Sequence, residues 1–103
     1  GESQIVSNND TDHDKLGLIV KKNSTRLQRE YNLYTSHGLV IMDVLAGSIS
    51  DKNQLKVGYV IKEVNGRVIT TLSDYERTLT KSDIILLTVD VDGYNYQLML
   101  KAR

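Results

Sequence analysis

The stretch at residues 38–69, with the sequence GLVIMDVLAGSISDKNQLKVGYVIKEVNGRVI, decides which fold this chain can adopt. Its apolar and partly β-branched run at residues 39–42 is typical of a buried strand. The mostly polar residues 48–54 leave room for only a turn or two of helix. Gly58 then precedes a second predicted strand at residues 59–64.

The second predicted strand ends in Asn65-Gly66, a pair that favours a tight reversal because both residues tolerate positive φ. Residues 67–69 can then run back beside the strand that they follow. The order of strand, short helix, strand and tight turn is the frame into which the rest of the chain must fit.

Length and composition predict one domain and argue against several classes of function. The chain has 103 residues, 40% of them hydrophobic, and no Trp or Phe, so Leu, Ile, Val and Tyr must form the core. Its 13 basic and 13 acidic residues cancel, which leaves no overall field for nucleic acid or an anionic membrane. No apolar run approaches the roughly 18 residues of a membrane-spanning helix. Because cysteine is absent, disulfides and thiolate zinc sites are excluded, and we expect no cofactor.

Residues 1–15 are rich in Ser, Asn, Asp and Thr, which favours a flexible leader or linker ahead of a domain at residues 16–103. Alternate aspartates within it have the spacing that opens a calcium-binding loop. That loop needs Gly where this chain has Lys15 and Glu where it has Lys21, so we expect no metal site there. His13 is accordingly expected in a solvated tail.

A glycine between two leucines, Leu16-Gly17-Leu18, comes directly before the apolar pair Ile19-Val20. Without a side chain, Gly17 lets the backbone turn and point consecutive N–H groups into one concavity, which forms a nest for an anion. A following strand at a sheet edge would leave alternate N–H and C=O groups for an extended peptide. The simpler alternative is that Gly17 only marks the start of a strand and that the leucines belong to the core.

These two stretches together resemble the PDZ domain, in particular the version in HtrA/Deg-type serine proteases. That version has the pattern G-[VL]-[VL]-[VI]-x-x-V, a Gly-Ser turn, and L-x-x-G-D-x-I-x-x-V-N-G. The chain matches it at Gly38-Leu39-Val40-Ile41, Val44, Gly47-Ser48, Leu55, Gly58, Ile61 and Val64-Asn65-Gly66. It departs from the pattern at Tyr59, where the family has Asp, and at Ile49-Ser50, which replace Pro-Ala.

The resemblance implies a single α+β domain, built as a five- to six-stranded, partly open antiparallel β-sandwich or barrel with two capping helices and a short inserted helix. It implies a non-catalytic module that binds an extended or C-terminal hydrophobic peptide by strand addition. The parent would be an HtrA/Deg-type serine protease of protein quality control in the periplasm or bacterial cell envelope. The alternatives are a structural PDZ domain that mediates assembly of the protease oligomer, and a PDZ domain of another envelope protease or secretion component.

The resemblance also implies which residues and partners are involved. Backbone N–H groups of Leu16, Gly17 and Leu18 would bind the peptide carboxylate, and the strand of Ile19, Val20 and Lys21 would pair with the peptide. The pocket for the last peptide side chain would be lined by Leu16, Leu18, Val20, Tyr75, Thr78 and Leu79. The partners would be protein C-termini or unfolded segments, the parent's protease domain and neighbouring subunits, without nucleic acid or direct membrane insertion. On this assignment Leu79→Glu would abolish peptide binding and leave the fold largely intact.

Two further helices are predicted. A short one at residues 26–31 follows Asn23 and Ser24, either of which can act as its cap, and has Leu27 and Tyr31 on its buried face. The basic residues around it lack interleaved exposed aromatics or a nucleic-acid motif, which favours a solvated face.

The longer predicted helix at residues 74–81 begins with a capping box formed by Ser73 and Glu76. One apolar stripe at helical spacing is formed by Leu72, Tyr75 and Leu79. In PDZ domains the corresponding helix walls the peptide groove opposite the strand that follows the Leu-Gly-Leu turn. The alternative is that Tyr75 and Leu79 are plain core residues.

The C-terminal third predicts a hairpin of residues 84–91 and 94–101 around Asp92-Gly93, a favoured two-residue turn. This turn sets the pairs Val91–Tyr94, Val89–Tyr96, Leu87–Leu98 and Ile85–Leu100. All four pairs lie on the face that we expect to be buried, since side chains alternate along each strand.

We expect no catalytic residue in this chain. His13 and His37 are the only histidines that could activate a serine, and no Gly-x-Ser-x-Gly elbow accompanies them. The sequence also has no Gly-rich phosphate loop, and its carboxylates are spread over separate predicted strands.

Overall fold

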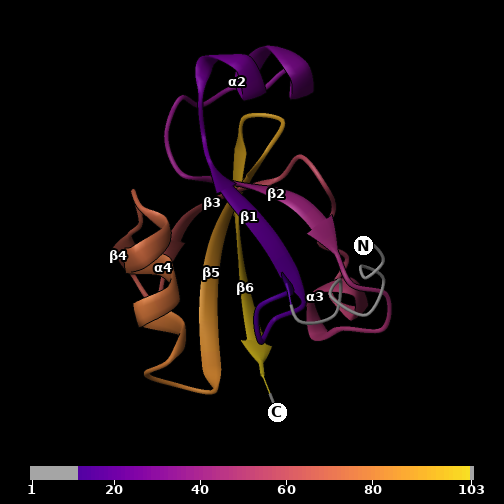
Figure 1. Ribbon diagram of the computed structural model, residues 1–103, viewed down its shortest axis with the longest axis vertical. Coiled ribbons are helices and arrows are strands. Elements are labelled where there is room, and N and C mark those ends of the chain that lie inside the picture. The colour runs from indigo at the N-terminus through magenta and orange to yellow at the C-terminus, as the bar shows by residue number, and fades with distance from the viewer. Residues whose placement is uncertain (1–11, 103) are drawn as a thin grey trace, which may run out of the picture.

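The computed structural model describes residues 12–102 of the chain. This part contains the strands β1 (Leu18–Lys22), β2 (Leu39–Val44), β3 (Val60–Val64), β4 (Arg67–Val68), β5 (Ile84–Val91) and β6 (Tyr94–Lys101), and the helices α2 (Thr25–Tyr31), α3 (Ile49–Lys52) and α4 (Leu72–Leu79). The strands form one antiparallel sheet in the order β1-β2-β3-β5-β6, and β4 pairs with β3 (Figure 1). The predicted α+β class and partly open antiparallel sheet are confirmed.

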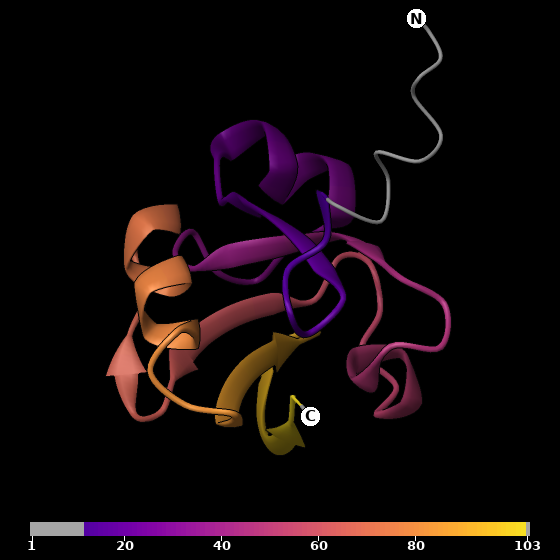
Figure 2. The same ribbon diagram turned by 60° about the horizontal axis from the view of Figure 1, so that its bottom comes forward.

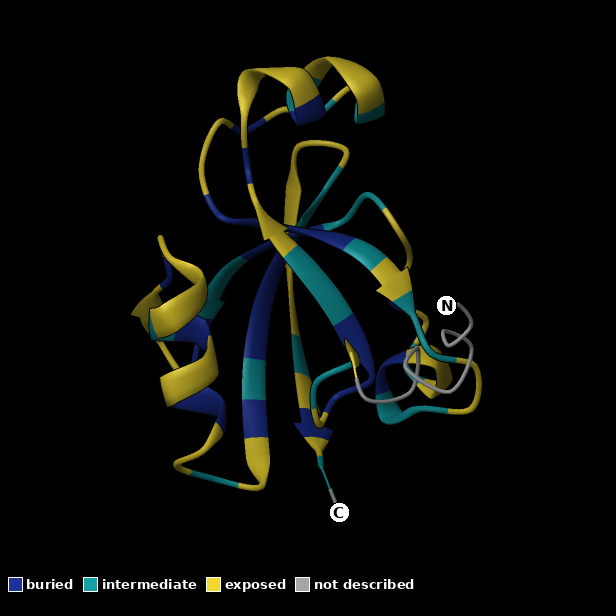
Figure 3. Ribbon diagram, viewed as in Figure 1, coloured by how far each residue is buried: buried dark blue, intermediate teal, exposed yellow. Residues whose placement is uncertain are grey.

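The sheet folds back on itself, so that β1 and β2 lie over β5 and β6 with the core between them (Figure 2). Figure 3 shows buried residues concentrated on the inner strands, while α2 is largely exposed. The core consists of Leu16, Leu18, Leu39, Ile41, Leu55, Ile61, Val64, Ile69, Tyr75, Leu79, Ile85, Leu87, Val89 and Leu100. A smaller cluster joins Leu27 of α2 to Val40 and Val60, which alternate onto the outer face of the sheet. Aliphatic packing therefore provides most of the stability, as a composition without Phe and Trp requires.

Both predicted tight turns are present. Asn65 and Gly66 have φ values of 54° and 78°, and Asp92 and Gly93 have values of 55° and 89°. Two consecutive residues with positive φ form a turn whose twist matches that of the flanking strands. The local sequence therefore determines where β3 and β5 reverse.

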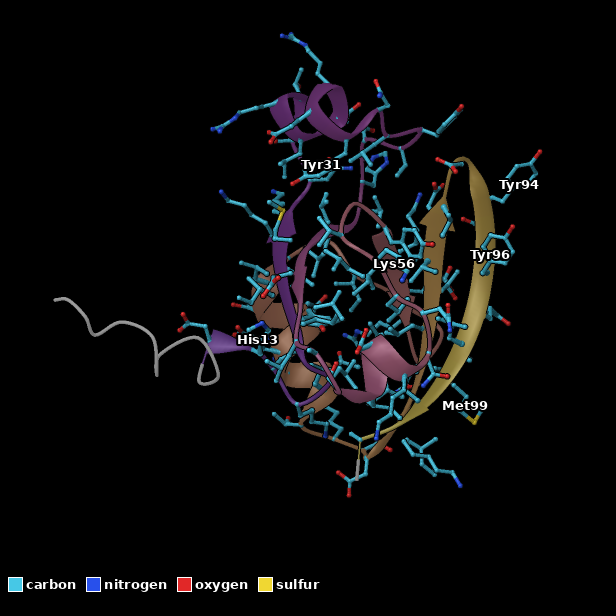
Figure 4. The ribbon with its side chains drawn as sticks, turned by 90° about the vertical axis from the view of Figure 1, so that its right-hand side faces the viewer. His13, Tyr31, Lys56, Tyr94, Tyr96 and Met99 are labelled. Carbon is cyan, nitrogen blue, oxygen red and sulfur yellow. The ribbon has the colours of Figure 1, made fainter. Side chains whose placement is uncertain are left out.

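The β5–β6 hairpin has the predicted register. The strands pair Val91 with Tyr94, Val89 with Tyr96, Leu87 with Leu98 and Ile85 with Leu100. The expectation that this whole face is buried is wrong near the turn, because Tyr94 and Tyr96 are 69% and 52% exposed. β6 is an edge strand, and Figure 4 shows both tyrosines pointing outward near the turn, whereas Leu100 at the other end of the strand is fully buried.

The N-termini of α2 and α3 are capped by serine side chains. The hydroxyl oxygens of Ser24 and Ser48 each accept a hydrogen bond from an N–H three residues later, at 3.2 and 3.1 Å, and so cap α2 and α3. Asn23, the other candidate cap for α2, instead donates its amide hydrogens to the carbonyls of Thr35 and His37. Asn23 therefore ties the loop before β2 to the end of β1.

The cap of α4 differs from the prediction. The helix begins at Leu72, and its cap is Thr71, whose hydroxyl accepts from the Asp74 N–H at 3.1 Å. The predicted capping box is wrong because Ser73 lies inside the first turn. The helix also ends at Leu79 rather than at residue 81.

We expect Thr71→Ala to lower the free energy of unfolding by about 1 kcal/mol, because the substitution leaves a first-turn N–H without its side-chain acceptor. Ser73→Ala, the matched control in the same turn, should change stability by less than about 0.5 kcal/mol. Urea unfolding of both variants measures the difference. A larger loss of stability for Ser73→Ala than for Thr71→Ala would show that Ser73 caps the helix, as the sequence predicted.

Candidate functional site

β1 lies at an open edge of the sheet. Among the described residues it pairs with β2 alone, and α4 lies beside it (Figure 1). The Gly17 carbonyl accepts from the Leu45 N–H, and the Asn23 N–H donates to the Gly38 carbonyl, so odd-numbered residues of this segment face β2. By alternation, the backbone groups of even-numbered β1 residues face the open edge. This is the geometry that strand addition requires.

Gly17 is required at the start of this strand for two reasons. Its φ of +86° lies in the left-handed region, which is unfavourable for residues that have a Cβ. A Cβ at this position would also collide with the Cβ and hydroxyl of Ser48, the cap of α3. The turn before β1 is therefore held against the α3 end of the domain.

The N–H groups of the predicted nest donate to a residue of the chain itself. The Leu16 and Leu18 N–H groups donate to Asp14 Oδ1 at 2.9 and 3.0 Å. The Gly17 N–H donates to the Asp14 backbone carbonyl at 2.9 Å. Sequence reasoning identified the three donors and missed Asp14, although an aspartate two residues before a turn often accepts from that backbone. Whether these donors also bind a peptide carboxylate stays a prediction.

Tyr75 links this nest to α4. Its hydroxyl donates to Asp14 Oδ2 at 2.5 Å, across 61 residues of sequence. Burial, together with the negative charge and hydrogen bond of Asp14, raises the pKa of the Tyr75 hydroxyl far above its ordinary value. The phenol therefore stays protonated and acts as the donor in this contact.

The residues predicted to line a pocket are brought together, but as parts of the core. Five of them are fully or nearly fully buried, namely Leu16, Leu18, Tyr75, Thr78 and Leu79. Val20 is partly exposed and packs against the main core. The Thr78 hydroxyl donates to the Asp74 carbonyl one turn earlier. All of these residues except Thr78 belong to the main core or pack against it, so a guest side chain can enter only if this packing opens. The pocket itself stays a prediction.

Two hollows that the sequence analysis missed lie at the other end of β1. One of about 230 Å³ is lined by Lys22, Asn23, Ser36, His37, Gly38, Thr70 and Thr71, and one of about 330 Å³ by Lys21, Lys22, Ser24, Arg26, Leu27, Glu30, Met42 and Leu72. Both include Lys22, the last residue of β1. Their linings come from α2, α4 and the loop before β2, and only tertiary structure could bring them together.

The prediction that His13 is solvated is wrong. Its side chain is 4% exposed, and Nε2 lies 2.7 Å from Oδ2 of Asp43 on β2. Within residues 12–102 no group of three or more His, Cys, Asp and Glu side chains is arranged to hold a metal, and no helix could span a membrane. The prediction of a leader at residues 1–15 falls mostly outside the described residues.

Comparisons with known proteins bear on the family and the fold of this chain. The sequence pattern of the PDZ domain family matches residues 4–89. No curated protein sequence matches the chain. Similar solved structures include the HtrA3 PDZ domain bound to a phage-derived ligand, FGRWV, at 23% identity and a TM-score of 0.68, over 84% of this chain and 79% of that one.

Two longer proteins also contain this fold. The HtrA-type protease AlgW with a decapeptide is 20% identical with a TM-score of 0.75, and a PDZ domain protein from Parabacteroides distasonis is 19% identical with a TM-score of 0.60. Each match covers 84% of this chain but only 27% and 19% of those chains. The structural similarity at these identities shows the fold, whereas the family match spans most of the sequence. The chain therefore belongs to the PDZ domain family.

Proposed function

We propose that this PDZ domain is the peptide-binding module of an HtrA/Deg-type envelope serine protease. It binds an extended or C-terminal hydrophobic segment, which adds to the sheet as a strand beside β1. The observation that carries the proposal is the open edge of β1 with α4 alongside it. Backbone pairing supplies affinity for many sequences, and alternate side chains of the guest supply selectivity.

The solved relatives support this role. The HtrA3 PDZ domain and AlgW were both determined with a peptide, and PDZ domains as a family bind peptides and C-termini. The chain spans 27% of AlgW, so any protease activity would belong to another part of the parent protein. In that setting the domain would select exposed or unfolded segments for the protease, in the periplasm or cell envelope.

The hollows around Lys22 fit the upstream part of such a ligand. A segment paired with Val20 and Lys22 would run past Leu72 of α4 and the loop at Thr70 and Thr71. Because the side chains at the Tyr75 end are packed together, we place the first contact of the ligand at this more open end.

Titration of the ¹⁵N-labelled chain with the pentapeptide FGRWV tests the proposal. We expect saturable shifts of the Val20, Lys21 and Lys22 amide signals. Val20→Pro is the matched variant, because it removes an N–H that faces the open edge and leaves the hydrogen bonds to β2 intact. It should retain the fold, seen in its spectrum, and lose peptide binding. Absence of β1 shifts at about 1 mM peptide, which corresponds to a binding free energy weaker than about −4 kcal/mol, would reject the proposal.

A structural role is the second candidate, and exposed side chains along the edge strand β6 favour it. Tyr94 and Tyr96 are exposed on one face of this edge strand, and Met99 is exposed on the opposite face (Figure 4). Exposed aromatic residues on an edge strand are suited to docking a protease domain or a neighbouring subunit. Loss of the parent's oligomer on replacing Tyr94 and Tyr96 with serine, with no peptide bound at β1, would select this role.

A further inference from the structure

Asp14 forms hydrogen bonds to the first residue of β1, on the open edge, through both its side chain and its backbone. Its Oδ1 accepts from the Leu18 N–H at 3.0 Å, while its own N–H donates to the Leu18 carbonyl at 2.9 Å. Leu18 is the first residue of β1, and both of its edge-facing backbone groups are thus in use. A second donor, the Leu16 N–H, points to the same carboxylate oxygen.

We propose that Asp14 sets the ligand specificity of this domain by acting as an internal occupant of the carboxylate nest. Extended segments pair with β1 from Val20 onward without needing a terminal carboxylate. A free C-terminus reaches the nest only after the Asp14 side chain leaves. This inference rests on the proposed peptide-binding function and adds a preference to it.

The chemistry of the nest explains why Asp14 is an effective competitor. A peptide carboxylate that displaces it makes hydrogen bonds of the same kind to Leu16 and Leu18, so the exchange yields little net gain. Asp14 is already tethered beside the nest, whereas a peptide loses translational and rotational freedom on binding. The two carboxylates also repel each other when both are near the same donors.

Tyr75 is a positioning residue in this arrangement. Its hydroxyl holds Asp14 Oδ2, the oxygen that does not contact the nest, and so connects the occupant to α4. Tyr75 and Leu79 of the same helix belong to the same buried cluster as Leu16 and Leu18. Departure of Asp14 would therefore release the contact that keeps α4 closed over the predicted pocket.

The test compares FGRWV carrying a free C-terminus with its C-terminally amidated twin, by calorimetry and by amide spectra. For the natural chain we expect the two affinities to agree within about threefold, because the nest is occupied. Asp14→Ala should raise affinity for the free peptide by about tenfold or more. The terminal carboxylate of the peptide can then accept hydrogen bonds from the Leu16 and Leu18 N–H groups, which Asp14 no longer occupies. Affinity for the amidated peptide should not rise, and the Leu16 and Leu18 amide signals should shift only with the free peptide.

Two matched variants separate occupancy from charge. Asp14→Asn keeps an oxygen that can accept from both N–H groups, so its preference should stay close to that of the natural chain. Asp12→Ala removes a nearby exposed carboxylate and should leave the preference unchanged. An equal gain in Asp14→Asn and Asp14→Ala would assign the effect to charge and overturn occupancy.

The natural chain alone also decides the matter if Asp14→Ala does not fold. A preference of about tenfold or more for the free peptide in the natural chain would show that the nest is available and overturn the proposal. Equal binding of both peptides in every variant overturns it too, while the peptide-binding function stands. Failure of both peptides to shift β1 in any folded variant rejects both proposals.

Discussion

Replacing Gly17 with alanine is expected to lower the free energy of unfolding by about 3 kcal/mol or more, through two additive causes. The φ of +86° is strained for any residue with a Cβ, and the new methyl group would collide with Ser48. The backbone of Gly17 cannot retreat easily, because its carbonyl accepts from the Leu45 N–H and its own N–H donates to the Asp14 carbonyl. Urea unfolding followed by circular dichroism measures the loss.

Two matched changes separate the causes. Gly47→Ala, at a φ of +83° with no atom within 4 Å of the place that its new methyl group would take, should lose only the conformational part, about 1–2 kcal/mol. Ser48→Gly removes the colliding side chain at a helix cap where glycine costs only a few tenths of a kcal/mol. The double variant Gly17→Ala/Ser48→Gly should therefore be more stable than Gly17→Ala alone. Equal losses at Gly17 and Gly47 would show that the close approach of Ser48 has no energetic consequence.

Local chemistry made much of the sheet predictable. Asn65-Gly66 and Asp92-Gly93 adopt positive φ with little strain, so each pair determines a turn without reference to the rest of the fold. Alternation then sets which side chains share a face, and the β5–β6 register follows. Burial along that face was less predictable, since it depends on which layers reach Tyr94 and Tyr96.

The candidate site depended on contacts between distant segments, which no periodic pattern encodes. Leu16, Gly17 and Leu18 were predictable as a nest because glycine permits the turn, but its occupant, Asp14, was assigned to a leader. The contact from Tyr75 to Asp14 exists only after α4 packs beside β1. The cap of α4 was similarly ambiguous from sequence, because Thr71 and Ser73 can both act as a cap. The tertiary position of the helix selects Thr71.

Leu79→Glu is expected to unfold the domain or to lower its free energy of unfolding by more than about 4 kcal/mol. This differs from the result expected from sequence, in which Leu79 lined an accessible pocket and the substitution only stopped peptide binding. Leu79 is 3% exposed and packs in the main core, so a glutamate there loses both the leucine's contacts and its own hydration. A small domain has a total stability of about 5–15 kcal/mol, so the loss removes much of it.

Leu72→Glu is the matched control, because it places the same residue on the same helix at the first position of the apolar stripe. Leu72 is 39% exposed, so its glutamate can reach water, and stability should change by less than about 1 kcal/mol. Thermal unfolding and amide spectra of both variants test the difference. A well-folded Leu79→Glu domain of near-natural stability would mean that α4 can swing away from β1 and open the predicted pocket at little cost. That result would also weaken the role of the Tyr75–Asp14 contact in holding the helix closed, since both depend on the same packing.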